Sequence, residues 1–388
     1  MKWGIILFPV FLFGQADFFG YIESEFDQIQ LRNQQYNFGY NKLRIDMESR
    51  PTDQVLFGAN INIQKFYGKI TWNFFDFLPE YIWKPVFQPE DEPDSLWISE
   101  MPIIIGDTLY LDNVYLRASF DRLDLTIGRQ QISLGTGYAW NPLDIFFRKD
   151  LFDPSYEQPG VNAIRVEISL GDRMSLDLIL SPEESWELTT KMIQGKVGIG
   201  SFDFTLNIAE QFRLFPYWRT EDTLSTHRNE KLLGGSFVGQ IGEIGLWGEG
   251  LFGSKSKPEA SGEYLLGLDH TFDSGTYVMG EYYHNSIGAD TSDLFFDHYM
   301  FYFTGETHSL MQNYLFFMVN QNVTEFVSIV LFGIANLDDK SVAINPQVNW
   351  NAFENVDISL FISKTFGEKD TEFGIQDWAF RIRLRAYF

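Results

Sequence analysis

The sequence alternates between apolar and polar positions in short segments along most of its length after the first sixteen residues. In one clear case, Ile164, Val166 and Ile168 alternate with Arg165 and Glu167. This period of two is the pattern of a β-strand whose two faces have different surroundings. No convincing stretch shows the 3.6-residue period of an amphipathic helix. The pattern therefore predicts an all-β protein.

Short links separate neighbouring segments and predict tight turns. The segment after Gly171-Asp172-Arg173 returns with the same alternation, so the two strands must be antiparallel neighbours. Eight such links recur, at residues 50–53, 121–122, 171–173, 200–201, 242–243, 273–275, 320–322 and 353–355. Longer connections lie between them, the first three at about 28–36, 76–110 and 135–160. The tight turns therefore fall at one end of the sheet and the long loops at the other.

This arrangement predicts about 18 strands, with 16 as the alternative, and places both chain ends on the tight-turn side. An even strand number is what a closed barrel requires. We therefore expect residues 17–388 to form a transmembrane antiparallel up-and-down β-barrel. A soluble β-sandwich also alternates, but so many strands are implausible for open packing. Aromatic residues near the expected strand ends fit the interfacial girdles of a membrane barrel, at Phe74, Phe75, Trp247, Tyr282, Tyr283, Phe316, Phe317 and Trp350.

Residues 1–16 have the features of a secretory signal peptide. Lys2 precedes the apolar run Trp3–Phe13, and Gly14-Gln15-Ala16 supplies small residues for cleavage. This run is too short to span ~30 Å of hydrocarbon, and Pro9 interrupts a helix, which argues against a membrane anchor. We expect cleavage near Ala16 and export of the mature chain.

Composition narrows the chemistry. The 388 residues include 29 Lys+Arg and 53 Asp+Glu, for a formal charge of −24, which disfavours nucleic acid as a partner. Cysteine is absent, so disulfides, thiolate zinc sites and cysteine nucleophiles are excluded. A mean hydropathy of −0.15 with 17% aromatic residues fits a sheet with one apolar face and excludes a helical membrane protein.

Signals for catalysis are weak. None of the five histidines forms an H-x-x-x-H or H-E-x-x-H pair. We expect no metal site, no cofactor and no enzymatic activity, with a barrel-embedded hydrolase as the less favoured alternative.

The last segment alternates without a break and ends on an aromatic residue. Phe380, Ile382 and Leu384 fall on one face, and the chain stops at Phe388. Such an ending resembles the C-terminal signal by which bacterial outer-membrane barrels are inserted. The resemblance implies recognition by the barrel-insertion machinery and a place among the lipid and lipopolysaccharide of a Gram-negative outer membrane.

A second resemblance lies within residues 114–146. Gly128-Arg129-Gln130 and Asn141-Pro142-Leu143-Asp144 resemble the G-R-Q…G…N-P-x-D segment of porin-like outer-membrane proteins. The resemblance implies a porin or channel for passive diffusion of small hydrophilic solutes or ions. It leaves the solute and the oligomeric state open, with a homotrimer as one option. A structural or adhesive barrel with a closed lumen is the alternative.

Charges on inward-facing strand positions would decide what passes such a barrel. Because the last strand must pair with the first, Arg381, Arg383 and Arg385 should lie beside Glu23 and Glu25. These arginines would form either a neutralised ladder, which we favour, or a guide rail for anionic solutes. The predicted lumen-lining residues are Glu23, Glu25, Lys42, Arg44, Arg117, Asp124, Arg129, Arg165, Glu167, Asp177, Arg381, Arg383 and Arg385.

The third long loop, at about 135–160, carries the N-P-x-D motif. In general porins the third external loop folds back into the lumen, so we favour a constriction over a loop packed outside. Its candidate residues are Asp144, Arg148, Lys149, Asp150, Asp153 and Glu157. Arg129 is expected to anchor Asp144 by a bidentate contact.

The second long loop, at about 76–110, is rich in proline and acidic residues, and we expect it to be irregular and exposed. Its carboxylates either bind divalent cations that bridge lipopolysaccharide or are simply solvated, and solvation is the commoner outcome.

Overall fold

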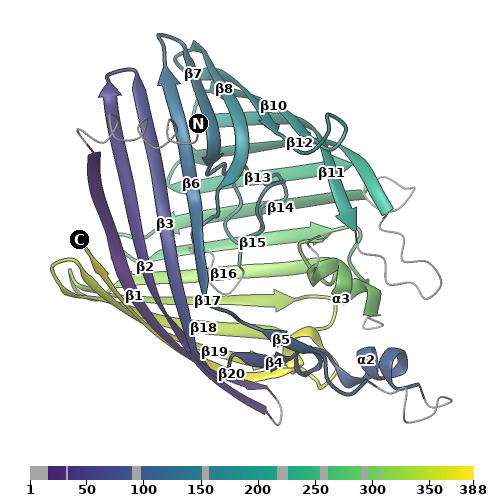
Figure 1. The fold of residues 1–388 in the computed structure, drawn as a ribbon. Coiled ribbons are helices and arrows are strands. Elements are labelled where there is room, and N and C mark those ends of the chain that lie inside the picture. Colours follow the sequence, from purple (N-terminus) through teal and green to yellow (C-terminus); the bar gives the residue numbers. More distant parts are fainter. Residues whose placement is uncertain are drawn as a thin grey trace, which may run out of the picture.

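The computed structural model describes residues 16–31, 34–89, 98–150, 157–215, 226–253, 261–290, 296–303, 305 and 307–388. Eighteen strands of this described part form one antiparallel sheet that closes into a barrel, because the first strand pairs with the last (Figure 1). The barrel strands are β1 (Ala16–Leu31), β2 (Gln34–Thr52), β3 (Val55–Gly68), β6 (Thr108–Ser119), β7 (Leu123–Gln130), β8 (Val161–Gly171), β9 (Met174–Ser181), β10 (Thr190–Ile199), β11 (Phe202–Phe215), β12 (Thr226–Ile241), β13 (Ile244–Gly253), β14 (Ser261–Thr271), β15 (Tyr277–Asn285), β16 (Asn313–Asn322), β17 (Val327–Asn336), β18 (Val342–Phe353), β19 (Val356–Phe366) and β20 (Gln376–Tyr387). The predicted 18-stranded barrel is confirmed.

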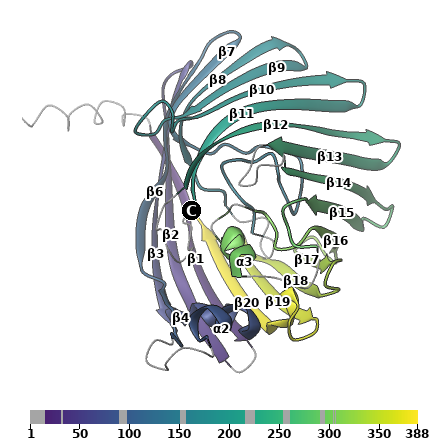
Figure 2. The ribbon, with the colours of Figure 1, turned by 90° about the vertical axis from the view of Figure 1, so that its right-hand side faces the viewer.

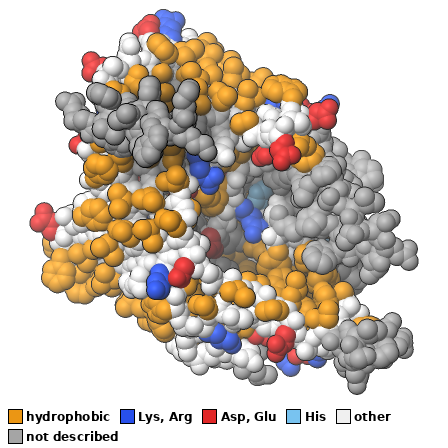
Figure 3. All heavy atoms as spheres, viewed as in Figure 1, with side chains coloured by type: hydrophobic (Ala, Val, Ile, Leu, Met, Phe, Trp, Pro, Cys, Tyr) orange, Lys and Arg blue, Asp and Glu red, His pale blue; other side chains and the backbone are white. Residues whose placement is uncertain are grey.

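The two faces of the strands differ as the alternation predicts. On β1, Ile22 and Phe26 point outward and are 56% and 37% exposed, whereas Glu23 and Glu25 are buried inside. Figure 3 shows hydrophobic side chains spread over the strands and charged side chains in the central hollow. So large an apolar outer surface suits hydrocarbon rather than water. Among the described residues, no helix is both long and apolar enough to cross a bilayer.

Tight turns lie at one end of the barrel, as predicted, and the connections at the other end are mostly longer, except for the one between β1 and β2 (Figures 1 and 2). Seven of the eight predicted turns overlap the observed ones. The turn predicted at 320–322 lies at 323–326 instead, because β16 stays paired with β17 as far as Asn322.

The first long loop was predicted at about 28–36, and this prediction is wrong. β1 and β2 stay paired up to Leu31 and Gln34, which leaves a link of only residues 32–33. The polar residues Gln28, Gln30 and Gln35 suggested a loop, but they continue the ladder of backbone hydrogen bonds. Polar side chains are compatible with a strand wherever it extends past the hydrocarbon.

The second long loop contains more regular structure than predicted. It forms β4 (Thr71–Asn73), η2 (Phe74–Phe77), α2 (Glu80–Phe87) and β5 (Pro102–Ile104), and β4 pairs with β5. Ile82 and Trp83 of α2 are buried, and the Trp83 ring stacks on Phe75 with centroids 4.4 Å apart. This packing orders a proline-rich segment that sequence composition marks as irregular.

Two further helices lie on the loop side. α3 (Phe296–Phe303) lies at the mouth of the barrel, and η4 (Glu372–Gly374) precedes β20 (Figure 2). At the opposite end of β20, two backbone hydrogen bonds extend its pairing with β1. The Phe388 N–H donates to the Gly20 carbonyl at 3.0 Å, and the Gly20 N–H donates to the Phe388 carbonyl at 3.1 Å. Of the predicted signal peptide 1–16, only Ala16 lies within the described residues, as the first residue of β1.

Candidate functional site

One part of the barrel interior is lined by charged side chains of β20, β1 and β2. We call this the charged wall, and its members are Glu23, Glu25, Asp27, Lys42, Arg44, Arg381, Arg383 and Arg385. Three hydrogen-bonded pairs join the closing strands: Arg381 with Asp27 at 2.7 Å, Arg383 with Glu25 at 2.5 Å and Arg385 with Glu23 at 2.6 Å. The predicted juxtaposition of the arginines with Glu23 and Glu25 is confirmed, and Asp27 adds a third rung.

A second ion-paired group lies on β8 and β9. Arg165 contacts Asp177 through Nε at 2.9 Å and Nη2 at 2.5 Å, and its Nη2 lies 3.0 Å from Glu167. Arg117 and Asp124, on β6 and β7, are half-buried, and Arg117 donates to Thr126 Oγ1 at 3.3 Å. These predicted lumen residues all lie at inward positions of their strands.

Arg129 does not make the contact predicted for it. Its Nε donates to the backbone carbonyl of Asp112 at 2.8 Å. Asp144 lies elsewhere and accepts its hydrogen bonds mainly from backbone N–H groups of its own loop. The expected bidentate anchor between Arg129 and Asp144 is therefore wrong, because the loop supplies the carboxylate with nearer donors.

The described parts of the third loop, residues 131–150 and 157–160, contact inward side chains of the barrel. Near its end, Glu157 reaches the charged wall, where Lys42 Nζ lies 3.1 Å and Arg44 Nη1 2.7 Å from Glu157 Oε2. The Tyr21 hydroxyl donates to Glu157 Oε1 at 2.8 Å. Burial raises the pKa of Glu157, but Lys42 and Arg44 outweigh it and hold that pKa below its usual value. The loop therefore contacts the inner surface of β1 and β2.

The other part of the same loop lies against β13 and β15, where two buried glutamates accept its backbone N–H groups. Glu249 accepts hydrogen bonds from Thr136 at 2.6 Å, Gly137 at 3.2 Å and Leu143 at 3.0 Å. Glu281 accepts from Tyr138 at 2.7 Å, Ala139 at 3.0 Å and Trp140 at 3.1 Å, and also from Trp247 Nε1 at 2.7 Å. An irregular loop has no ladder to satisfy its N–H groups, so these two carboxylates replace one.

Local backbone geometry favours this arrangement. Gly135 has a φ of +84°, and a Cβ at this position would lie 2.6 Å from Glu249 Oε2. Only glycine allows both the left-handed backbone and the close approach of the carboxylate. Lys149 Nζ completes the turn by donating to the Gly137 and Tyr138 carbonyls at 2.5 and 3.1 Å. Burial lowers the pKa of Lys149, although the nearby carboxylates oppose the shift.

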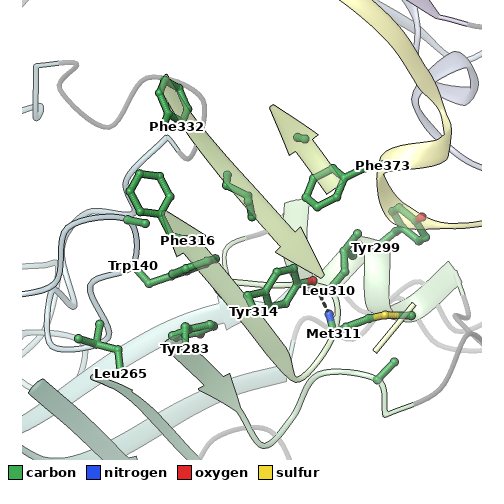
Figure 4. Close-up of a cluster of buried hydrophobic side chains, with 14 of the residues drawn as sticks. Trp140, Leu265, Tyr283, Tyr299, Leu310, Met311, Tyr314, Phe316, Phe332 and Phe373 are labelled. Atoms are coloured by element: carbon green, nitrogen blue, oxygen red, sulfur yellow. Dashed lines mark hydrogen bonds between the residues drawn. The ribbon is translucent and has the colours of Figure 1, made fainter. Parts of the chain in front are cut away.

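Aromatic side chains fill the space beside this part of the loop. Their inward positions on β13–β17 form what we call the aromatic wall, made of Trp247, Tyr283, Tyr314, Phe316 and Phe332. The Trp140 ring of the loop stacks on Tyr283, with centroids 4.9 Å apart and planes 6° from parallel (Figure 4). Stacked aromatic pairs add to the stability that burial alone supplies.

The aromatic wall corrects the prediction of interfacial girdles. Trp247, Tyr283 and Phe316 are 7%, 0% and 0% exposed and point into the barrel. Phe75 is also buried, whereas Trp350 is 47% exposed on the outer face. In β13–β16 apolar residues occupy both faces, so the alternation does not reveal which aromatic residues point outward.

Asp144, the last residue of the N-P-x-D motif, is buried inside the loop. Its Oδ1 accepts from the N–H groups of Phe146 and Phe147, both at 3.1 Å, and its Oδ2 accepts from Gln158 at 3.1 Å. Burial raises the pKa of Asp144 to about 6, although the hydrogen bonds oppose the shift. The structure thus places this candidate where it holds the loop together and not at the loop surface.

The remaining candidates of the loop have different surroundings. Arg148 donates to the backbone carbonyls of Tyr302 and Thr307, the latter at 3.3 Å, and its guanidinium lies over the Tyr302 ring. Asp150 is exposed and lines a space of about 200 Å³ with Asp27 and Arg381. Asp153 lies outside the described residues.

Two further spaces lie against polar inward positions. One, of about 280 Å³, is lined by Arg44, Asp46 and Arg117, and another, of about 340 Å³, by loop residues Ser133–Thr136 and by Lys196. In Figure 3 charged side chains are visible in the hollow of the barrel. The interior is therefore not filled by side chains on its charged side.

Within the described ranges, no three His, Asp or Glu side chains gather as metal ligands. His308 is buried, with Nδ1 2.6 Å from Glu263 Oε2, and the Tyr283 hydroxyl donates to the same oxygen at 2.8 Å. These contacts tie the loop after β15 to the aromatic wall.

Sequence reasoning missed Glu249 and Glu281. Each is an acidic residue in the middle of an apolar strand segment, at the same face as buried residues such as Trp247 or Tyr283. A lone carboxylate at an inward, otherwise apolar position requires donors from another element. That signal was present in the sequence, but it does not say which element supplies the donors.

Comparison with solved structures identifies the fold. OccAB4 of Acinetobacter baumannii has a TM-score of 0.57 at 9% identity, over 96% of this chain and 98% of that one. OccK3 (OpdO) of Pseudomonas aeruginosa has a TM-score of 0.53 at 8% identity, over 96% of each chain. This chain shares their fold. No model of a protein family matches the sequence, and no curated protein matches it either.

Proposed function

We propose that this chain is an outer-membrane channel for passive diffusion of small hydrophilic solutes or ions, with residues 131–160 as its constriction. The observation that carries the proposal is where the described parts of this loop, residues 131–150 and 157–160, are bound. The loop is bound to Glu249 and Glu281 on β13 and β15, and through Glu157 to β1 and β2 across the barrel. Attachment of one loop to two distant parts of the wall supports the proposal that it narrows the space between them.

Three other features support an outer-membrane location. The barrel has an apolar outer face, residues 1–16 have the pattern of a signal peptide cleaved near Ala16, and the aromatic Phe388 directly follows the alternating strand β20. The likeness of residues 114–146 to the G-R-Q…N-P-x-D segment of porin-like proteins agrees with them. We therefore propose insertion by the barrel-insertion machinery, contact with lipid and lipopolysaccharide, and a homotrimer as one option for assembly.

The charged wall bears on selectivity. Each ladder arginine faces a carboxylate, so the ladder offers little free positive charge to an anionic solute. We propose that it stabilises the closing strands and that ion selectivity is weak. A guide rail for anions would require arginines without such partners.

Single-channel recording in planar bilayers tests the channel. Purified wild-type protein should produce discrete ion-conducting steps. Insertion without conductance would overturn the proposal and favour the second candidate, a structural barrel with a closed lumen. That candidate draws its support from the aromatic wall and Trp140, which fill one part of the interior.

The absence of cysteine makes a chemical test of the constriction clean. In Asp150→Cys, an anionic thiosulfonate reagent added to the bath should reduce conductance, because Asp150 is exposed beside Asp27 and Arg381. Ser24→Cys is the matched control, since Ser24 alternates with Glu23 and Glu25 and points outward. Equal responses of the two variants, or no response of Asp150→Cys, would contradict a constriction at this loop.

A further inference from the structure

A groove on the outer face of the barrel, across β9–β13, has no part in the proposed channel. Its volume is about 730 Å³, within the range of small-molecule sites. Ile193, Ile208 and Leu233 form its floor and are 49%, 54% and 52% exposed. Trp186, from the loop between β9 and β10, and Phe252 of β13 line its sides. The groove is thus an apolar hollow on the surface that faces the membrane.

The rim of this groove carries three charged residues side by side. The strand register pairs Lys191 with Glu210 and Glu210 with Lys231. Lys191 Nζ lies 3.2 Å from Glu210 Oε2 and 4.8 Å from the centre of the Trp186 ring. Lys231 is exposed and makes no hydrogen bond or ion pair with any residue in the described part of the chain. The rim therefore has two ammonium groups for one carboxylate.

The rim lies at the loop end of the strands, and the apolar floor lies nearer the tight turns. Lys191 is the second residue of β10, and Ile193 follows it on the same outward face. In a membrane barrel this level is the interface between acyl chains and head groups, where lysine and tryptophan are favoured. The charged rim at the loop end matches the head of an amphipathic anionic lipid, and the apolar floor toward the tight turns matches its acyl chains.

We propose that this groove binds a phosphorylated glycolipid of the outer leaflet, with a phosphate against the ammonium groups of Lys231 and Lys191 on the side away from Glu210 and an acyl chain over Ile193, Ile208 and Leu233. The inference rests on the proposed outer-membrane location. A second copy of the chain is the rival occupant of an apolar face. The rim has an excess of positive charge, so it favours an anionic ligand over the equally positive rim of a second copy.

The test uses full-length protein refolded in detergent without lipopolysaccharide, so that the groove starts without lipid. Bisphosphorylated lipid A is titrated, and bound lipid is counted by native mass spectrometry. Lys191→Gln with Lys231→Gln should weaken binding about 30-fold, since each lysine near a phosphate surface contributes roughly a fivefold effect. Lys65→Gln is the matched control, because Lys65 is an exposed outward lysine on β3, away from the groove.

Several results would overturn the inference. They are equal binding by the double variant, an equal loss in Lys65→Gln, or equal binding of lipid A stripped of both phosphates. If the wild-type protein has the mass of two or three chains and the double variant has the mass of one, the groove would be assigned to a second copy instead. Heat-modifiable electrophoretic mobility checks folding, and unchanged conductance of the double variant keeps this test separate from that of the channel.

Discussion

On the charged wall each ladder carboxylate faces an arginine of the neighbouring strand, whereas beside the aromatic wall Glu249 and Glu281 face backbone N–H groups of the third loop. Both arrangements satisfy buried carboxylates, but they constrain different things. The ion pairs join two strands that are already adjacent in the sheet. The two glutamates instead determine where a segment without secondary structure runs.

This difference indicates where substitutions will have local or wide effects. Loss of one rung of the ladder leaves the backbone pairing of β1 and β20 in place. Loss of Glu281 leaves several buried N–H donors without an acceptor, which costs about 1–3 kcal/mol for each donor. We therefore expect the aromatic side of the interior to be the more sensitive one.

The largest effect is expected for Glu281→Ala. The variant should lower the free energy of unfolding by about 5 kcal/mol and raise conductance, because the N–H groups of residues 138–140 lose their acceptor. Denaturant titration and single-channel recording measure the two effects. Glu325→Ala, in an exposed turn, is the control and should change neither. Wild-type conductance in Glu281→Ala would mean that Glu281 does not hold the loop.

Trp140→Ala should cost about 3–4 kcal/mol, because the buried ring leaves a cavity against Tyr283. Trp350→Ala offers the same substitution on the outer face, where the side chain is 47% exposed, and should cost less than half as much. Denaturant midpoints of the two variants in the same detergent give the comparison. Similar losses at both positions would remove the distinction between inner and outer aromatic residues.

The stability of the third loop should fall as the pH rises from about 5 to 7. Burial raises the pKa of Asp144 to about 6, so the folded loop binds more protons in this range than the opened loop does. The whole shift of this pKa is worth about 3 kcal/mol, of which roughly 1 kcal/mol is lost between pH 5 and 7 and the rest at lower pH. The pKa of Glu157 is lowered, so its protonation changes the stability of the loop only below this pH range.

Hydrogen exchange of residues 131–150, corrected for the intrinsic rate, measures this dependence. Asp144→Asn should abolish it. If the variant keeps the same dependence on pH, another group is responsible.

Arg383→Gln should cost about 2 kcal/mol, less than breaking a fully dry ion pair, because the interior has open space on this side. Glu25→Gln in the same chain should restore most of the loss, since an amide pair replaces the charged pair. A double-mutant cycle on denaturant midpoints isolates the coupling. Additive losses would show that the two side chains do not stabilise each other.

The smallest effect on stability, about 1 kcal/mol, is expected for Glu157→Gln. Its main result should be a shift of the reversal potential in a KCl gradient towards anions, because Lys42 and Arg44 lose a negative partner. Glu325→Ala again serves as the control. An unchanged reversal potential would place Glu157 away from the ion path.

The sequence allows the charged wall to be predicted better than the loop. Barrel closure and alternation together require Arg383 and Glu25 to be neighbours, and a period of two leaves little freedom in register. Residues 136–143 follow no period, so nothing local reveals that they lie against Glu249 and Glu281. Phe316 shows the same limit within a strand, because apolar neighbours on both faces hide its direction.

The pairing of β1 with β20 also determines when the barrel can close. Its partners are separated by 354 to 362 residues in the three ladder pairs, so the two edges can meet only after both have been synthesised. Contacts so distant in sequence form slowly. Of the two strands that must meet, β1 carries acidic residues and β20 carries basic residues at the paired inward positions. Because the charges of the two edge strands are complementary, β20 pairs preferentially with β1. This preference disfavours pairing with the edges of unrelated sheets during assembly.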